Sequence, residues 1–393
     1  MQSMKIVVIS AVAQTLVSFR GPLLAALVIE GHEVVACAPG KESPLYESTK
    51  VKDVIAQLNE LGVTYRAVDL DRTGFTPVKD LRSLLGLSKL LKEMRPDIVL
   101  SYNHKPVIYG SLAARLVGVP RRFSIITGLG FVFGEDTFKR RMINTLVGRL
   151  YRLGLADNVA VFFQNPDDLA FFVRSKLVAD PTQTVLINGS GVDLDHFSEV
   201  PPYTQRPVFL LVARLIREKG IMEYVEAART LKRRYPQAAF RILGSFDDHP
   251  SCVKQSQIEA WQREGTIEYL GEAKDVRPSI ACASVIVLPS YYGEGTPRSI
   301  LEAMAMGRPI ITTNTPGCRE TVVDEENGFL VPAKDVTALV DAMEKFILRP
   351  GLLAHMGKQS RRIATEKYDV HKVNAIIMKT MRVFGNKANA NLT

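Results

Sequence analysis

The sequence predicts an α/β protein made of two doubly wound, Rossmann-like domains, each with a parallel sheet. Three observations support this fold class. Short apolar runs of strand length alternate with helix-period segments along nearly the whole chain, a pattern typical of parallel sheets covered by helices on both faces. The alternation stops at 201–207, where three prolines occur, and then restarts. The length of 393 residues is enough for two domains.

The expected strands of the first half are short apolar runs bounded by polar or glycine residues. They lie at 6–10, 33–37, 63–68, 98–101, 123–127 and 160–163. The expected helices of this half have apolar residues at three- and four-residue spacing, and they lie at 19–30, 78–94, 107–117, 137–155 and 167–173. The first run is β-branched rather than leucine-rich, which favours a buried strand over a secretory signal.

The second half repeats the pattern. Its expected strands lie at 209–213, 240–243, 267–270, 285–288 and 310–312, with helices at 220–233, between the later strands and after 334. We therefore place an N-terminal domain at 1–200 and a C-terminal domain at 206–370. Ligands of doubly wound sheets bind at the carboxyl ends of the strands, beside helix N-termini that attract phosphate. Two such domains facing a central cleft would hold a phosphorylated ligand.

The composition excludes several classes of protein. The chain is 46% hydrophobic and 23% charged, which is ordinary for a globular protein and excludes wholesale disorder. No apolar run reaches the roughly 18–20 residues of a membrane-spanning helix. The four cysteines form no CxxC pair and no zinc-ligand spacing with the six histidines. We therefore expect neither a disulfide scaffold nor a zinc site, and a reducing cytoplasmic setting fits best.

The net charge of +9 favours an anionic partner, which could be nucleic acid, a phosphorylated small molecule or anionic lipid. The chain has no Cys/His finger, no RNP-type aromatic motif and no long Lys/Arg run, so we expect no nucleic acid. The expected helix at 138–155 has five basic and no acidic residues, and its apolar positions share one face at 142, 143, 146, 147, 150 and 153. Such a helix suits an anionic membrane surface; a core helix with a cationic solvent face is the alternative.

The second half opens with a strand that leads directly into two cations. Arg214 ends the apolar run, and Lys219 precedes the next helix by one or two residues. Both side chains are expected over the carboxyl edge of the sheet, beside a positive helix end. A guanidinium, an ammonium and free backbone N–H groups together suit a diphosphate. The alternative is a solvated loop with incidental charge.

A glycine-rich loop with two glutamates follows the expected strand at 285–288. Glu294 lies in the loop, and Pro297 suits the first turn of the helix that carries Glu302. Amides near Arg298 and Ser299 can meet a phosphate or sugar oxygen. Glu294 can reach sugar hydroxyls, and Glu302 can accept hydrogen bonds from a ribose diol. The alternative is a capping glutamate on a solvated helix.

These two elements, together with the Asn-Gly-Ser-Gly-Val-Asp run at 188–193, resemble the signatures of the retaining family-4 glycosyltransferases of the GT-B fold. The resemblance covers essentially the whole chain and implies a UDP-sugar donor, although the choice of UDP over GDP rests on the resemblance alone. It implies that the last helix, at about 371–386, completes the first domain. The donor-binding residues that it implies are Arg214, Lys219, Gly271, Gly295, Thr296, Arg298, Ser299 and Glu302.

Four segments of the first half resemble the branch of this family that extends undecaprenyl-diphosphate-linked sugars. They lie at 19–20, 103–106, 127–130 and 163–168. The resemblance implies a lipid-linked saccharide acceptor and a peripheral position on the inner face of the cytoplasmic membrane. The acceptor-binding residues that it implies are Arg20, His104, Lys105, Thr127 and Gly128. The catalytic residues would be Glu294, Lys219, Arg214 and His104.

The first half departs from the family pattern in two places. Residues 10–14 read Ser-Ala-Val-Ala-Gln where many members have a Gly-Gly loop, and Thr127 stands where many have a histidine. The nearest histidine to that strand end is His104, which could orient the acceptor or the donor phosphate. A loop histidine that caps a helix is the alternative.

Two further patterns imitate other sites. The glycine run at 128–134 resembles a dinucleotide-binding loop, but it has one residue too many and follows a late strand, so we expect no nicotinamide site. Asp-x-Asp pairs at 69–71 and 193–195 match a metal-binding spacing. Because Arg214 and Lys219 can neutralise a leaving diphosphate, we expect no metal and no other cofactor.

We therefore expect a retaining transferase that moves a hexose or N-acetylhexosamine to a polyprenyl-diphosphate-linked saccharide in polysaccharide or glycan assembly. One alternative is a UDP-sugar 2-epimerase of the same fold, which needs no acceptor. Another is a non-catalytic nucleotide-sugar-binding protein. The basic helix favours a lipid acceptor over epimerisation, and the two intact glutamates argue against a pure binding protein.

Overall fold

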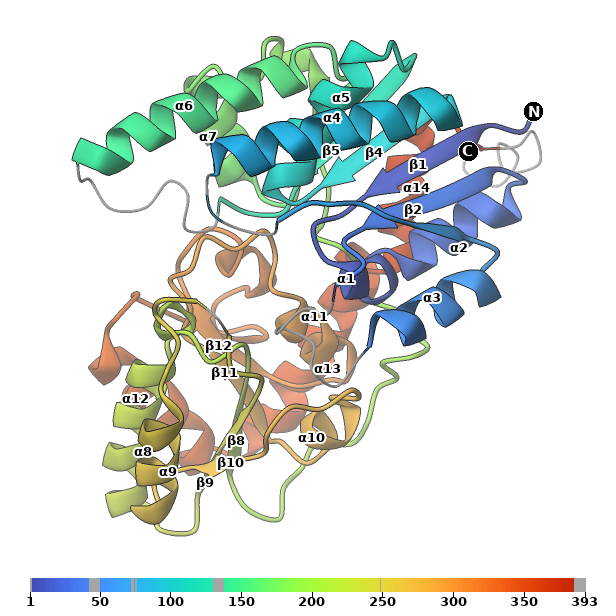
Figure 1. Cartoon of the computed structure of the whole chain (residues 1–393). Helices are drawn as coiled ribbons and strands as arrows, with labels where there is room; N and C mark the ends of the chain where they lie inside the picture. Colours follow the sequence, from blue (N-terminus) through green and yellow to red (C-terminus); the bar gives the residue numbers. More distant parts are fainter. Residues whose placement is uncertain are drawn as a thin grey trace. The chain divides into compact units, whose positions relative to one another are not determined.

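The computed structural model describes residues 2–41, 50–71, 74, 76–129, 138–247 and 249–384, with the backbone alone for 138–144. The described chain forms two compact units. The first contains the residues up to 190 together with those from 371 onward, and the second contains 191–370. Figure 1 shows the elements of each unit in sequence colours.

The first unit is built on a seven-stranded, fully parallel sheet of order β3-β2-β1-β4-β5-β6-β7. Its strands are β1 Lys5–Ile9, β2 Glu33–Ala38, β3 Thr64–Ala67, β4 Ile98–Tyr102, β5 Arg121–Ile126, β6 Ala160–Phe163 and β7 Thr184–Leu186. Strand β1 pairs with β2 and β4, so that Val7 lies between Val35 and Val99. The chain order reverses beside β1, and at such a switch point ligands bind at the carboxyl ends of the strands.

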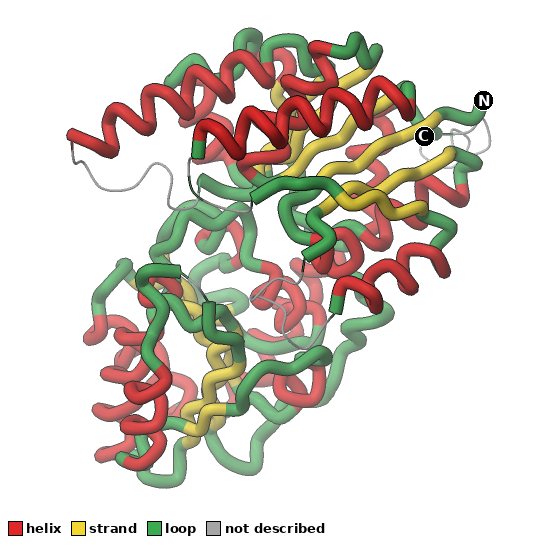
Figure 2. The backbone as a smooth tube through the Cα atoms, viewed as in Figure 1, coloured by secondary structure: helices red, strands yellow, loops and turns green. Residues whose placement is uncertain are grey.

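Helices cover both faces of this sheet (Figures 1 and 2). One face carries α1 Ala13–Ser18, α2 Gly21–Ile29, α3 Val51–Glu60 and α14 Val370–Met381, whose apolar side chains share one buried cluster. The other face carries α4 Pro77–Met94, a π-helical turn Pro106–Gly110, α5 Ser111–Leu116, α6 Phe138–Leu155 and α7 Pro166–Arg174. Contacts between Ser111 and Ser124 and between Phe163 and Phe172 seat α5 and α7 on this second face.

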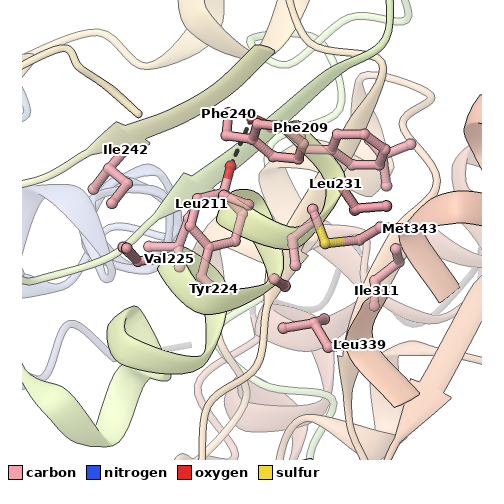
Figure 3. Close-up of a cluster of buried hydrophobic side chains, with 14 of the residues drawn as sticks. Phe209, Leu211, Tyr224, Val225, Leu231, Phe240, Ile242, Ile311, Leu339 and Met343 are labelled. Atoms are coloured by element: carbon pink, nitrogen blue, oxygen red, sulfur yellow. Dashed lines mark hydrogen bonds between the residues drawn. The ribbon is translucent and has the colours of Figure 1, made fainter. Parts of the chain in front are cut away.

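The second unit has a six-stranded parallel sheet of order β10-β9-β8-β11-β12-β13. Its strands are β8 Val208–Val212, β9 Ala239–Leu243, β10 Glu268–Tyr269, β11 Val285–Leu288, β12 Ile310–Thr313 and β13 Gly328–Val331. Its helices are α8 Ile221–Arg234, α9 Gln255–Arg263, α10 Arg277–Ala281, α11 Arg298–Ala305, α12 Val336–Leu348 and α13 Gly351–Lys367. In the core, the rings of Phe209 and Phe240 stack at 5.5 Å, and the Tyr224 hydroxyl donates to the Phe209 carbonyl at 2.8 Å (Figure 3).

The predicted fold class of two parallel α/β sheets is confirmed. The elements differ from the prediction in detail. The helix expected at 19–30 is α2, which begins at Gly21 and has Pro22 in its first turn, and the separate helix α1 precedes it. The helix expected at 107–117 begins as the π-helical turn. The structure adds α1, α3, β7 and β13, which the sequence pattern did not predict.

The segment between 191 and 207 belongs to the second unit by its contacts. Val192 and Asp369 form a bridge, and the Val192 N–H donates to the Tyr368 carbonyl at 2.8 Å. The buried guanidinium of Arg308 donates to the carbonyls of Val200 at 3.1 Å and Pro201 at 2.9 Å. The boundary by contacts therefore precedes the proline-rich segment on which the expected domain limits were based.

Candidate functional site

In the second unit, charged side chains gather at the carboxyl ends of β8 and β11. Arg214 follows β8, and Lys219 ends the 3-10 turn Arg217–Lys219 that precedes α8. Glu294 lies in the loop after β11. The Lys219 ammonium donates to Glu294 Oε1, which also accepts from Ser290 Oγ at 3.1 Å. Three of the residues proposed from the sequence as catalytic therefore lie on neighbouring strand ends of one sheet.

Arg214 is fixed by two residues that the sequence reasoning did not single out. Its guanidinium donates to the fully buried carboxylate of Asp247, which follows β9, and lies 5.6 Å from the ring centroid of Tyr292. The Lys219 ammonium lies 5.2 Å from the same ring. Burial lowers the pKa of Arg214, but Tyr292, Asp247 and Glu294 together raise it above its ordinary value. Arg214 is therefore held as a cation beside Lys219.

The loop that carries Glu294 packs against a glycine of the next strand–helix connection. Gly317 has a φ of +83°, and a Cβ on this residue would lie 2.5 Å from the Gly295 carbonyl oxygen and 2.6 Å from that of Glu294. A side chain at this position would therefore push the loop away. The short turn is closed by the Glu294 N–H, which donates to the Tyr292 carbonyl at 2.7 Å.

Glu302 lies on α11, one turn beyond the start of the helix at Arg298. Its carboxylate forms an ion pair with Arg298 Nε at 2.7 Å, and 8% of the residue is exposed. Burial raises the pKa of Glu302, and the adjacent guanidinium of Arg298 opposes that rise. Thr296 is buried, whereas Ser299 is partly buried. The sequence prediction that these residues share one helix start is consistent with this geometry.

The remaining donor residue, Gly271, follows β10 at the same edge of the sheet. Its carbonyl accepts from the Gly244 N–H at 2.8 Å, which ties the segment after β10 to that after β9. The strand ends β8, β9, β10 and β11 thus each supply part of one polar edge, as expected for a parallel sheet.

In the first unit, a polar network joins the carboxyl ends of β1 and β4. Asn103 follows β4 with a φ of +71°, and its side-chain carbonyl accepts from Ser10 Oγ at 3.1 Å. Ser10 Oγ lies 2.8 Å from Thr15 Oγ1, which lies 3.0 Å from the Tyr102 hydroxyl. The network therefore begins at residues 10–14, where many members of the family have a Gly-Gly loop.

His104 and Lys105 follow this network, and their side chains take different partners. His104 Nδ1 lies 2.6 Å from the hydroxyl of Tyr151 on α6, and burial lowers the pKa of the partly buried imidazole to about 4. The imidazole is therefore neutral at neutral pH. Lys105 is buried and forms an ion pair of 2.6 Å with Asp80 on α4. Tyr151 and Asp80 are residues that the sequence reasoning did not identify.

The other acceptor residues lie near the same edge. The buried guanidinium of Arg20 lies 5.3 Å from the ring centroid of Tyr102, at the end of β4. Thr127 and Gly128 follow β5, where Thr127 is partly buried and Gly128 is buried with a φ of +111°. The rest of the glycine run, from 130 onward, lies outside the described residues.

Within the described residues, no group of three or more His, Cys, Asp or Glu side chains could hold a metal ion. The two Asp-x-Asp pairs have local partners. Asp193 Oδ1 accepts from the N–H groups of Asp195 at 3.0 Å and His196 at 2.9 Å, and Asp71 lies 3.7 Å from Lys79. No helix of the described chain is long and apolar enough to cross a membrane.

Comparisons with known proteins agree with this arrangement. Residues 193–363 match the family model of the group 1 glycosyl transferases, and 20–189 match that of the glycosyl transferase 4-like domain. The chain is 27% identical to the N,N'-diacetylbacillosaminyl-diphospho-undecaprenol alpha-1,3-N-acetylgalactosaminyltransferase of Campylobacter jejuni, over 93% of this chain and 95% of that protein. It is 31% identical to WcaL of Escherichia coli, a glycosyltransferase named after colanic acid biosynthesis, over 79% of this chain and 76% of that protein.

A solved structure gives the same fold. HepE from Anabaena, in complex with UDP-glucose, superposes with a TM-score of 0.75 at 16% identity, over 96% of this chain and 99% of HepE. The two family models cover consecutive parts of the chain and coincide with its two α/β units. The chain therefore belongs to the group 1, family-4-like glycosyltransferases of the GT-B fold.

Proposed function

We propose that this glycosyltransferase is a retaining enzyme that moves a hexose or an N-acetylhexosamine from a UDP-sugar to a polyprenyl-diphosphate-linked saccharide. The product would belong to a bacterial surface polysaccharide or glycan. The cluster of Arg214, Lys219 and Glu294 is the observation that carries the proposal. The substrate named for the Campylobacter jejuni relative supports the acceptor class, and the UDP-glucose complex of HepE supports the donor class.

In the proposed reaction, the acceptor oxygen forms a bond to the anomeric carbon while the bond from that carbon to the diphosphate oxygen of UDP breaks. The acceptor proton passes to the leaving oxygen on the same face of the sugar, which accounts for retention without a protein nucleophile. Negative charge grows on the departing diphosphate, where Arg214 and Lys219 stabilise it. Glu294, held by Lys219 and Ser290, would orient the sugar hydroxyls.

The other donor contacts follow from the polar edge of the second sheet. Glu302 would accept hydrogen bonds from the ribose diol, as acidic residues do in nucleotide-binding sheets. Gly271 would contact the base through its backbone. The start of α11 and the loop before it would contact phosphate or sugar oxygens through Gly295, Thr296, Arg298 and Ser299.

On the acceptor side, we assign the diphosphate and the first sugars to the strand ends of the first unit. His104 would orient the acceptor as a neutral imidazole, and Arg20 would balance the charge of the lipid diphosphate. Lys105 would act as a positioning residue, because its ammonium is held in a buried ion pair. Thr127 and Gly128 would line the same edge. The basic helix α6 would hold the enzyme on the anionic inner face of the cytoplasmic membrane.

Incubation of the purified protein with UDP- and GDP-sugars and bacterial lipid extract tests this proposal. Mass spectrometry should detect a diphospholipid that has gained the mass of one sugar. Lys219→Ala should weaken UDP binding roughly tenfold or more, since a charge-assisted contact of about 1.5–3 kcal/mol is lost. Glu294→Gln should retain UDP binding but lose most of the transfer.

A matched control is Lys358→Ala, which removes an exposed lysine from α13; it should leave both measurements unchanged. Equal effects of Lys219→Ala and Lys358→Ala would contradict the assignment of the diphosphate site. Interconversion of UDP-sugars without any lipid product would replace the transferase proposal by the epimerase.

A further inference from the structure

The two cations assigned to the donor diphosphate each have a carboxylate partner. Arg214 pairs with Asp247, and Lys219 pairs with Glu294. The four side chains follow β8, β9 and β11 at one edge of the second sheet. Two positive and two negative charges cancel, so these four side chains together are formally neutral. The charge of the site is therefore balanced before an anionic diphosphate arrives.

The two carboxylates differ in their surroundings. The side chain of Asp247 is 0% exposed, whereas those of Glu294 and Lys219 are 12% and 11% exposed. In the proposed reaction Glu294 orients the sugar, so it can exchange its contact with Lys219 for a contact with the donor. A carboxylate without exposed surface has no route to the ligand, and it stays charged in a buried place only beside a cation. Asp247 therefore remains the partner of Arg214 when the donor binds.

The loop after β9 fixes Asp247 independently of its ion pair. The Asp247 N–H donates to Cys252 Sγ at 3.3 Å, within the same loop. This loop is also joined to the segment that carries Arg214, because the Leu215 N–H donates to the Ser245 carbonyl at 3.0 Å. Both partners of the ion pair are thus attached to one pair of connected loops, and the carboxylate holds the guanidinium in one place.

Arg214 keeps donors for a ligand although it is paired. A guanidinium has five N–H donors, and the contact with Asp247 uses Nη1. The ring of Tyr292 lies 5.6 Å from the guanidinium carbon and adds a second contact. Asp247 therefore sets the position of the guanidinium and at the same time reduces the net charge that the guanidinium presents to a ligand.

The chemistry of the proposed transfer makes release of the product difficult for a site of this kind. The diphosphate of a UDP-sugar is esterified at both ends, and transfer of the sugar leaves UDP with a terminal phosphate monoester. A monoester has a second pKa of about 6, so UDP carries about one more negative charge at neutral pH than the UDP-sugar. Cations that stabilise the charge on the leaving diphosphate therefore bind the product more tightly than the substrate.

We propose that Asp247 is a positioning residue that acts through Arg214: it holds the guanidinium in place and offsets its charge, so that UDP leaves after transfer. This inference rests on the proposed UDP-sugar donor, and it gives the site a residue for product release in addition to those that bind the donor. Removal of the Asp247 charge should therefore tighten the binding of UDP. A carboxylate with a merely structural role would, when removed, leave UDP binding unchanged or weaken it.

Calorimetric titration of the full-length protein with UDP tests the inference. Asp247→Asn keeps the size of the side chain and an oxygen for the guanidinium but removes the charge. UDP should bind this variant roughly tenfold more tightly than the parent protein, the factor expected for one unit charge near the diphosphate at an effective dielectric constant of about 20. The rate of UDP dissociation in stopped flow should fall by a similar factor. Asp247→Ser removes the same charge with a smaller side chain and should change both quantities in the same direction.

A second substitution tests whether Asp247 acts through Arg214. In Arg214→Ala, the buried carboxylate loses the cation that pairs with it and takes up a proton, since an unpaired charge is too costly to bury. Adding Asp247→Asn to Arg214→Ala should therefore leave the UDP affinity unchanged. Asp341→Asn is the matched control, because it removes the same charge from an exposed position on α12 of the same unit; it should bind UDP like the parent protein.

Three outcomes would overturn the inference. The first is UDP affinity in Asp247→Asn and Asp247→Ser no higher than in the parent protein. The second is equal tightening by Asp341→Asn, which would make it a general charge effect. The third is tightening by Asp247→Asn in the Arg214→Ala background, which would mean that Asp247 does not act through Arg214. Because UDP binding needs no acceptor, the expected pattern without any lipid product would support the inference and contradict the proposed transfer.

Discussion

At the scale of single residues, His104 combines a polar partner with a weakened affinity for protons. Its Nδ1 lies 2.6 Å from the Tyr151 hydroxyl, and burial lowers the pKa of the imidazole to about 4. A neutral ring has one N–H donor and one acceptor nitrogen, so the contact with Tyr151 fixes which nitrogen remains for a ligand. In the proposed reaction, His104 therefore acts through hydrogen bonding and orientation rather than through positive charge.

The lowered pKa gives a prediction about stability. An unfolded histidine titrates near 6.5, so His104 contributes its full stabilisation above that pH and loses it as pH falls towards 4. Between about pH 7.5 and about pH 5, the free energy of unfolding of the first unit should fall by about 2 kcal/mol more in the parent protein than in His104→Gln. Urea unfolding followed by circular dichroism at the two pH values measures the difference. The control His355→Gln, at an exposed histidine of α13, should lose as much stability between the two pH values as the parent protein. A loss of the same size in His104→Gln would contradict the assignment.

Several residues of the candidate site were predictable and their partners were not. Arg214, Lys219 and Glu294 follow strands that the apolar pattern identified, so their place at the sheet edge follows from parallel topology. Asp247 also follows an identified strand, by four residues, and that position was the signal that could have found it. The stacking of Tyr292 on Arg214 depends on how two loops pack, and local spacing does not encode such a contact.

At the scale of elements, the loop that carries Glu294 depends on close packing against Gly317. A Cβ there would overlap the Gly295 and Glu294 carbonyl oxygens. Gly317→Ala should therefore displace the loop and lower kcat/KM roughly a hundredfold, since a shift of about 1 Å at a reacting group has that effect. Steady-state kinetics and the melting temperature should be measured together.

The control for this prediction separates backbone strain from displacement of the loop. Gly265 ends α9 with a φ of +71°, and a Cβ there would meet open space. Gly265→Ala should cost about 1 kcal/mol of stability through its backbone alone and leave kcat/KM unchanged. If Gly317→Ala retained the parent kcat/KM, the proposed dependence of the loop on this glycine would be wrong.

The accuracy of the predicted elements varied with their burial and length. The buried strands β6 and β11 and the 18-residue helices α4 and α6 were predicted within one residue at each end, because their apolar periodicity is continuous. The edge strand β7 has three residues, too few to show a period. The π-helical turn at Pro106–Gly110 is a local departure from the helical spacing that periodicity assumes.

At the scale of the whole molecule, the chain leaves the first unit after Ser190 and returns to it at His371. The returning helix α14 contributes to the buried cluster of the first unit through Val373, Ile377 and Met378. His32 of the turn before β2 lies 2.8 Å from the Val383 carbonyl, which anchors the end of this segment. Within the described residues, the two buried clusters of the second unit extend to Tyr368 and include no residue of α14. Stability in the two units therefore depends on separate sets of side chains.

This separation predicts which of the two units a core substitution will destabilise. Ile377 is fully buried in the first cluster, so Ile377→Ala should cost about 2–5 kcal/mol. Hydrogen exchange measured by mass spectrometry should then accelerate in peptides of β1 to β7, with little change in those of β8 to β13. Met343→Ala, at a fully buried residue of the second unit, should give the reverse. Equal acceleration of both sets of peptides in either variant would mean that the units unfold as one cooperative block, and that α14 stabilises the whole chain rather than the sheet on which it packs.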